Sequence, residues 1–308
     1  RMNYLIFGDG WQRIPGATRT PLSSSCFQPI RPPVSVLREL RLCKYPMITS
    51  VSNDLIKLVK TLHHKKGRLQ ENLFLAEGIH LVQEGLKSGF KIKHFFWTEK
   101  LTKTSEGREL LGVLEDGYQG YEVSELVLAK ISETENPQGI VATIELPPEK
   151  NLKDFTEFKL GLIIDGLQDP GNVGAIIRTA WAFGCDGLFF TPGTADPYQG
   201  KVVRASMGGI FYQPICRNLE PRTIYEWASR MGIQIIAGDS KATEFCFQSK
   251  LAGASLILIG NEGRGLSPEW ANYPITKVLI PQPGGAESLN ASIAAGILLY
   301  EALRQRLI

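Results

Sequence analysis

Residues 160–180 read LGLIIDGLQDPGNVGAIIRTA, and this stretch decides the fold class of the C-terminal half. Its first five residues form a continuous apolar run, which is typical of a strand buried on both faces of a parallel sheet. Turn residues follow at 169–172, and a helical pattern comes after them. We therefore expect a strand, a loop and a helix, with Asn172 as the helix cap and Arg178 projecting toward the cleft that the loop borders.

Two further loops follow apolar runs in the same half. The first, GNEGRGL at 260–266, carries three glycines, which suit an unusual backbone path or contact with a flat ligand. The second, IPQPGGAESLNASIAAG at 280–296, leads into a helix rich in small residues, which we expect to run from about Ser288 to Arg306. Taken singly, each loop has a plainer explanation. The first can be a turn with an ordinary helix cap and a surface Arg, and the second a glycine-rich tight turn. In the third, Ser288 can be an N-cap and Asn290 a polar residue of the first helical turn.

The spacing of the apolar runs predicts an α/β protein with two domains. In the C-terminal half, further strands are expected at 187–191, 233–237, 256–259 and 278–280, with helical patterns between them. This alternation favours a mostly parallel sheet covered on both faces, with ligands bound beyond the carboxyl ends of the strands. We assign residues 157–308 to this domain.

A smaller α/β domain is expected over residues 47–146. Its patterns predict helices from Asp54, from Ala76 to Leu86 and over 122–131, and its strands are expected at 92–98 and 140–146. The sequence LPPEK at 146–150 then has the composition of a stiff, polar linker.

The composition excludes several classes of protein. Hydrophobic residues make up 43% of the chain and charged residues 21%, which is typical of a globular protein rather than a disordered one. The five cysteines contain no C-x-x-C pair and the four histidines have no zinc-finger spacing, so we predict no metal site. No apolar run reaches the roughly 18 residues that a membrane span needs. The formal net charge of +3 permits a nucleic-acid partner without indicating one.

The first 46 residues have a different character. They contain seven Arg and Lys residues against Asp9 and Glu39, and no helical or strand period persists in them. One interpretation is an organelle transit peptide, because such peptides are rich in Arg and poor in acids. We favour the other, an unstructured or extraneous extension before a start at Met47, because well-patterned sequence begins there. The expected location is then the cytoplasm.

The three loops, in this combination and order, resemble those of the SpoU/TrmH family, the 2′-O-ribose branch of the SPOUT methyltransferases. The resemblance covers about residues 157–308, and the matching stretches are D-x-x-x-D-P-G-N-V-G-x-x-x-R-T-A, G-N-E-G-x-G-L and I-P-x-x-G-x-x-E-S-L-N-x-S-x-A. Residues 50–145 resemble the substrate-binding domain that precedes the catalytic domain in many rRNA-directed members. The cues there are NDLIK at 53–57, FLAEG at 74–78 and NPQGI at 136–140.

The resemblance implies a SPOUT-type parallel sheet with a trefoil knot, S-adenosylmethionine as cofactor and a homodimer formed through the catalytic domains. It implies that the cofactor lies against Gly260, Ile280 and Leu289, with Gln282 and Leu258 as weaker candidates. It also implies that Arg178 is the residue nearest the reacting ribose hydroxyl, as general base or as a group that stabilises developing charge. Because a guanidinium has a pKa above about 12, the second role is the easier one physically. The remaining site residues implied are Asn172, Glu262, Ser288 and Asn290.

The implied substrate is RNA, and the extra N-terminal domain favours ribosomal RNA over tRNA. A basic run in that domain is a candidate phosphate contact through Lys65, Lys66 and Arg68, although such runs are usually solvated surface. A tRNA methyltransferase and a non-catalytic RNA-binding protein remain alternatives. An NAD- or nucleotide-binding enzyme would need a phosphate fingerprint that the sequence lacks. The modified nucleotide, and a housekeeping or a resistance role, are left open.

Overall fold

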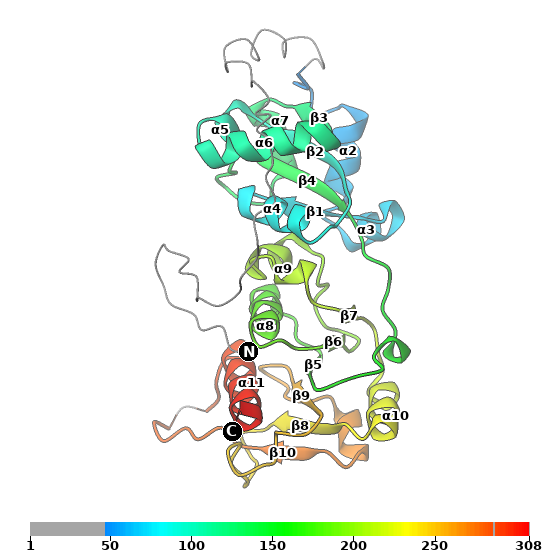
Figure 1. Cartoon of the computed structure of the whole chain (residues 1–308), viewed down its shortest axis with the longest axis vertical. Helices are drawn as coiled ribbons and strands as arrows, with labels where there is room; N and C mark the ends of the chain where they lie inside the picture. The colour runs from blue at the N-terminus through cyan, green and yellow to red at the C-terminus, as the bar shows by residue number, and fades with distance from the viewer. Residues whose placement is uncertain (1–46, 286, 308) are drawn as a thin grey trace, which may run out of the picture. The chain divides into compact units, whose positions relative to one another are not determined.

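Two β-sheets organise the part of the chain that this computed structural model describes, residues 47–285 and 287–307. The first sheet has the strand order β1-β4-β2-β3, and the second has the order β10-β8-β9-β5-β6-β7 (Figure 1). The α/β fold class is therefore confirmed. The expectations for residues 1–46 concern a segment outside the described ranges.

The second sheet is parallel throughout, as the apolar runs predicted. Its strands are β5 (Leu160–Ile164), β6 (Gly187–Phe190), β7 (Ile215–Cys216), β8 (Gln234–Gly238), β9 (Ser255–Ile259) and β10 (Thr276–Val278), and every pairing between them is parallel. The two-residue strand β7 was not predicted, because a run this short has no period to detect.

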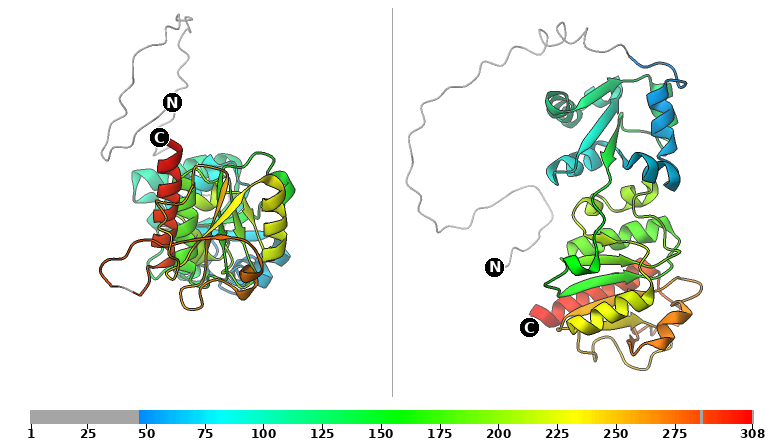
Figure 2. Two further views of the ribbon diagram at one scale, coloured as in Figure 1. Left: turned by 90° about the horizontal axis from the view of Figure 1, so that it is seen from below. Right: turned by 90° about the vertical axis from the view of Figure 1, so that its right-hand side faces the viewer.

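Helices cover both faces of the second sheet (Figure 2). Leu162 and Ile257 share a core with α8 (Pro170–Ala182) and α11 (Ala291–Leu307). Their neighbours in the strands, such as Ile163, face the opposite way and share a core with α10 (Pro221–Met231). Short 3-10 helices lie at η1 (Leu152–Asp154), η2 (Gly209–Phe211) and η3 (Pro268–Asn272), and one further helix is α9 (Gly200–Ala205).

Two helices of this half begin at other residues than predicted. The N-cap of α8 is Asp169 rather than Asn172, because Pro170 occupies the first helical position and Asp169 Oδ1 accepts a hydrogen bond from the Asn172 amide at 2.8 Å. Helix α11 begins at Ala291 rather than Ser288. There Asn290 Oδ1 accepts from the Ser292 amide at 2.9 Å, as an N-cap residue does.

The first sheet is mixed and is covered by helices of the N-terminal half. Strand β4 (Ile140–Glu145) pairs antiparallel with both β1 (Leu73–Glu77) and β2 (Ile92–Trp97), and β2 pairs parallel with β3 (Gln119–Glu122). The helices are α2 (Asp54–Thr61), α3 (Lys65–Glu71), α4 (Ile79–Lys87), α5 (Glu99–Thr102), α6 (Ser105–Gly117) and α7 (Glu125–Ile131). No helix among the described residues is long and apolar enough to cross a membrane.

The predictions for this half were partly wrong. Ala76 lies in β1 and not in a helix, because Gly78, with φ at 95°, ends the strand before α4 starts at Ile79. The predicted helix over 122–131 is a strand end followed by α7, whose N-cap is Ser124. Strands β1 and β3 and helices α3, α5 and α6 were not predicted, because their runs are short or mix the two periods.

Candidate active site

The three loops singled out in the sequence meet at one edge of the second sheet. Strands β5 and β9 are parallel neighbours, as are β8 and β10, so the loops that follow them leave from the same side. A cleft of about 530 Å³ lies there, within the usual size range of small-molecule sites. Its walls come from the ends of β8, β9 and β10, from the glycine-rich loop 260–266 and from the start of α11.

Four of the five predicted cofactor residues line this cleft, namely Gly260, Ile280, Gln282 and Leu289. The fifth, Leu258, does not line it. Leu258 is fully buried on β9, where its side chain packs with the core on the α10 face of the sheet. The alternation of side chains along a strand is the reason, since Ile259, one residue further on, does line the cleft.

The glycine-rich loop closes on itself. The backbones of Asn261 and Gly265 exchange two hydrogen bonds of 2.9 and 2.8 Å. A side chain at Gly260 would place its Cβ 2.6 Å from the Gly265 carbonyl oxygen, so this position requires glycine. Asn261 Nδ2 also donates to the Gly166 carbonyl at 3.0 Å, which ties this loop to the one after β5.

A second connection between these loops runs through Asp165, which the sequence analysis did not identify. Asp165, the residue directly after β5, is 2% exposed. Its carboxylate accepts from Thr191 Oγ1 at 2.8 Å, and from the amide and hydroxyl of Ser267 at 2.7 and 3.1 Å. Asp165 therefore holds the ends of β5 and β6 to the residue that follows the glycine-rich loop. The available signal was an acid placed immediately after a buried apolar run.

A chain of polar side chains joins the three loops at the rim of the cleft. Asn290 Nδ2 donates to Asn172 Oδ1 at 2.8 Å, and Asn172 Nδ2 donates in turn to Glu262 Oε1. In the sequence, Asn172 is 90 residues from Glu262 and 118 residues from Asn290. The structure thus brings together three of the five predicted catalytic residues.

The other two predicted catalytic residues stand apart from this chain. Ser288 is exposed and lines the cleft. Arg178 is exposed on α8, does not line the cleft and makes no hydrogen bond or ion pair with any described residue. Glu262 bonds to Asn172, and no ion pair joins it to Arg178 in the described part of the chain.

The cleft presents polar and charged groups to a small ligand. Gln282 Oε1 is buried without a hydrogen-bond partner among the described residues, so it has an acceptor to offer. Lys277 Nζ lies 3.0 Å from Asp239 Oδ2. A hydrogen bond from the Lys241 amide and the charge of Lys277 hold the pKa of Asp239 below its ordinary value, so its carboxylate is ionised at neutral pH. No three His, Cys, Asp or Glu side chains of the described ranges are grouped as a metal site would need.

The basic run of the N-terminal half divides in two. Lys65 and Lys66, on the first turn of α3, are exposed. Arg68 is 3% exposed and its guanidinium pairs with Asp196 at 2.6 Å. Arg68 Nη1 also donates to two backbone carbonyls, so each of the three guanidinium nitrogens has an acceptor. The structure therefore leaves Lys65 and Lys66 exposed for the predicted contact with RNA, whereas it buries Arg68 in an ion pair.

Both halves of the chain match known protein families. Residues 159–300 match the SpoU rRNA Methylase family, and residues 53–142 match the MRM3-like substrate binding domain. A Bacillus subtilis relative, named 23S rRNA (guanosine(2553)-2′-O)-methyltransferase RlmP, is 37% identical over 82% of this chain and 97% of its own length. A Streptomyces viridochromogenes relative, named 23S rRNA (uridine(2479)-2′-O)-methyltransferase, is 31% identical over 80% of this chain and 88% of its own length.

Solved structures resemble the whole of both halves. The SpoU methyltransferase AviRb from Streptomyces viridochromogenes, in complex with the cofactor AdoMet, has a TM-score of 0.76 and 30% identity over 83% of this chain and 98% of its own. An AdoMet-bound rRNA methyltransferase from Sinorhizobium meliloti has a TM-score of 0.74 and 33% identity, covering 84% of this chain and 97% of its own.

Proposed function

Because this chain belongs to the SpoU rRNA methylase family, we propose that it transfers a methyl group from S-adenosylmethionine to a ribose 2′-hydroxyl of ribosomal RNA. The observation that carries the proposal is the side-chain link between Asn290, Asn172 and Glu262 at the rim of a cleft of cofactor size. We assign residues 157–308 to the methyltransferase domain and residues 47–146 to a domain that binds the RNA.

The residues of the cleft fit the cofactor. When bound, S-adenosylmethionine supplies an electrophilic methyl group on a good leaving group. Gly260, Ile280 and Leu289 would hold it through backbone and apolar contacts, and Gln282 would offer its buried amide oxygen as an acceptor.

The remaining task is to place a weak nucleophile correctly. Holding two reactants in line supplies about 7–11 kcal/mol of barrier reduction, so orienting groups account for much of such a rate. We assign that work to Asn172, Asn290 and Ser288, with Glu262 fixing Asn172. Arg178, whose donors are unoccupied, is suited to hold the adjacent phosphate and to stabilise charge on the ribose oxygen. A role as general base is the alternative.

We further propose a homodimer formed through the catalytic domain, with α11 at the contact. Helix α11 buries Ala295, Leu298 and Ala302 against its own chain. It also exposes Ile293, Tyr300 and Leu307, which are seven residues apart and so share its outer face. A helix that is apolar on both sides needs a partner on each, and a second copy would cover this stripe.

The trefoil knot stays a prediction that two contacts support. After β10, the Leu279 amide and carbonyl bond to Glu244 and Cys246 of the loop that follows β8. The end of α11 returns to the same loop, where Gln305 Oε1 accepts from the Leu251 amide at 2.7 Å. The cytoplasmic location also stays a prediction, with organelle targeting by residues 1–46 as its alternative.

The proposal is tested with RNA from a strain that lacks the gene. Purified protein and labelled S-adenosylmethionine are incubated with that strain's ribosomal RNA and, separately, with its tRNA. We expect label in ribosomal RNA at one ribose, mapped by reverse transcription at low nucleotide concentration. Label in tRNA alone would favour the tRNA alternative, and cofactor binding without transfer to either RNA would favour the non-catalytic one.

A further inference from the structure

One short segment of the C-terminal half makes the contact with the first sheet. We call the contacts of residues 194–213 with the N-terminal half the seam. At its centre, Phe74 of β1 packs against Tyr198 with ring centroids 5.2 Å apart, and Phe90 packs against Phe211 at the same distance. Three of these four rings are at most 5% exposed. An apolar seam of this kind opposes movement of one half against the other.

Two sets of ion pairs of opposite polarity also join the two halves. In the first, Arg68 of the N-terminal half pairs with Asp196 of the C-terminal half, and their side chains are only 4% and 10% exposed. In the second, the cation is Arg204 of α9 and the acids belong to the N-terminal half. Both sets join the two halves, so a shift of one half against the other would lengthen the ion pairs of both sets.

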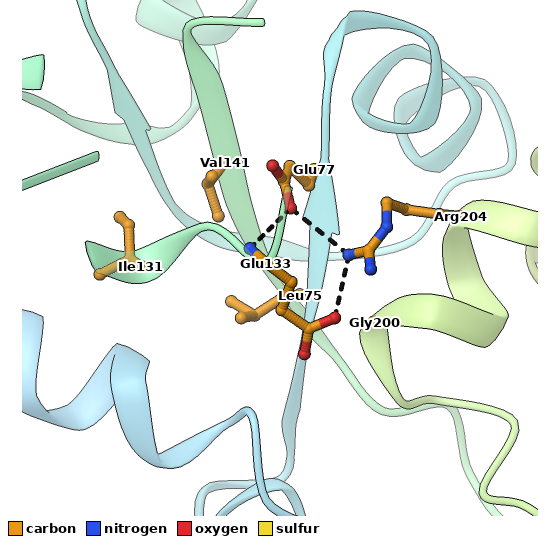
Figure 3. A pocket seen from close by; sticks show the side chains of 7 residues that line it. All are labelled: Leu75, Glu77, Ile131, Glu133, Val141, Gly200 and Arg204. Carbon is orange, nitrogen blue, oxygen red and sulfur yellow. Dashed lines mark hydrogen bonds and ion pairs between the residues drawn. The ribbon is translucent and has the colours of Figure 1, made fainter. Parts of the chain in front are cut away.

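The Arg204 set is the more extended of the two (Figure 3). Arg204 Nη1 lies 3.0 Å from Glu133 Oε2 and 3.4 Å from Glu77 Oε2. Glu77 is fixed by hydrogen bonds from the Glu133 amide and the Thr134 hydroxyl, and Glu133 bonds to His63 Nδ1 at 3.1 Å. The bond with His63, together with the charge of Arg204, holds the pKa of Glu133 below its ordinary value against the effect of burial.

This cluster is too tightly packed to be a ligand site. The cavity between its side chains measures about 10 Å³, which holds one water molecule at most. The Glu133 carboxylate packs against the start of α9, where a Cβ on Gly200 would collide with it. The groups are therefore placed to bind one another.

The same segment also touches the helix that carries Arg178. A Cβ on Gly174 of α8 would lie 2.7 Å from the Val202 carbonyl of α9, so the two helices are in backbone contact. A Cβ on Gly209 would lie 3.2 Å from the Arg178 Cα. The segment that contains Arg204 therefore contacts the N-terminal half on one side and the helix of Arg178 on the other.

We propose that Arg204 is a positioning residue, which with Glu77 and Glu133 fixes the N-terminal half in one orientation relative to Arg178. RNA held by the N-terminal half is thereby presented to the reacting groups in one register. The inference rests on the proposed function. Its consequence is a defect confined to RNA that reaches both halves, because a short RNA bound only at the reacting groups does not depend on the orientation of the first sheet.

The experiment compares Arg204→Gln and the conservative Arg204→Lys with wild type on two substrates. One is ribosomal RNA from the strain lacking the gene, and the other is an oligonucleotide of the mapped site. We expect Arg204→Gln to lower kcat/KM about tenfold on the long RNA and less than about twofold on the oligonucleotide, since displacements of about 1 Å cost up to a hundredfold in rate. Arg204→Lys should retain most activity on both. Arg222→Gln is the matched control, because Arg222 forms an exposed pair with Glu226 within α10.

A charge exchange and a fold measurement complete the test. Arg204→Glu should be worse than Arg204→Gln, and adding Glu133→Arg should restore part of the activity, as expected for residues in contact. Hydrogen exchange over residues 194–213 should rise in Arg204→Glu and fall again in the double variant, and this readout needs no RNA. Equal reductions on both substrates, or a result like that of Arg222→Gln, would overturn the inference. An inactive wild type with the expected exchange pattern would instead count against the proposed function alone.

Discussion

The cleft edge of the second sheet and the seam both join residues from distant parts of the chain, but they treat charge differently. At the edge, Glu262 and Arg178 are exposed, and the stiffness comes from backbone ties and from the buried Asp165. At the seam, the side chains of Arg68 and Glu77 are only 4% and 7% exposed, and they form ion pairs with residues 128 and 127 positions away in the sequence. The edge thus leaves the Arg178 guanidinium without a partner among the described residues, whereas at the seam the Arg68 and Arg204 guanidinium groups are both held in ion pairs. The two regions should therefore respond to mutation in different observables.

The largest expected effect at the edge is on turnover. Arg178→Ala should lower kcat by about 100- to 1,000-fold, the usual cost of removing one donor that stabilises developing charge. Cofactor affinity, measured by calorimetry, should stay within about twofold, because Arg178 does not line the cleft. Arg178→Lys keeps the charge without the planar fork and should fall between. A variant Arg178→Ala that kept most of its turnover would remove Arg178 from the reacting groups.

At the seam, the corresponding substitution should affect stability. Arg68→Met leaves Asp196 buried without its partner and should lower the free energy of unfolding by about 3 kcal/mol. Adding Asp196→Asn should restore part of that stability, which chemical denaturation would measure. Arg222→Met, in an exposed pair, is the control and should cost less than about 1 kcal/mol. If Arg68→Met behaved like this control, the seam would not be the rigid contact described above.

A smaller effect at the edge separates cofactor binding from chemistry. Gly260→Ala places a Cβ 2.6 Å from the Gly265 carbonyl, and overpacking of this kind costs about 1–3 kcal/mol, which would weaken cofactor affinity roughly tenfold. Gly284→Ala in the neighbouring loop is the matched control, since no atom lies within 4 Å of its Cβ. Titration calorimetry of both variants decides the matter. Equal cofactor affinities of the two variants would show that the glycine-rich loop accommodates the added methyl group without loss of binding free energy.

The same contrast explains what could be predicted from sequence. The loops of the edge carry glycine, proline and asparagine at close spacing. Such residues indicate a turn from the local sequence alone, so these loops could be found without knowledge of the fold. The position of Leu258 was not predicted, because alternation along β9 turns its side chain to the α10 face of the sheet. The burial of Arg68 was not predicted because it depends on Asp196, and no local pattern connects residues 128 apart. The ion pairs of the seam were outside the reach of sequence for the same reason.

The smallest expected effect is on RNA affinity and concerns the basic run of the N-terminal half. With Arg68 assigned to the seam, only Lys65 and Lys66 remain as candidate phosphate contacts. Removing one cation that binds a phosphate flattens the plot of log affinity against log salt by about 0.7–0.9 units, because fewer counterions are released. The variant Lys65→Ala/Lys66→Ala should therefore weaken binding of ribosomal RNA and reduce that slope by roughly 1.4–1.8 units, while cofactor affinity stays unchanged.

The matched control for this variant is Lys103→Ala/Lys130→Ala, two exposed lysines elsewhere in the same half. Both double variants remove the same net charge, so a general effect of charge would lower the two slopes equally. A difference confined to Lys65 and Lys66 would place RNA phosphates beside α3, next to the buried Arg68–Asp196 pair of the seam. If the plots of log affinity against log salt had the same slope for wild type and Lys65→Ala/Lys66→Ala, the two lysines would not contact RNA phosphates. The N-terminal half would then have to bind RNA through another of its faces.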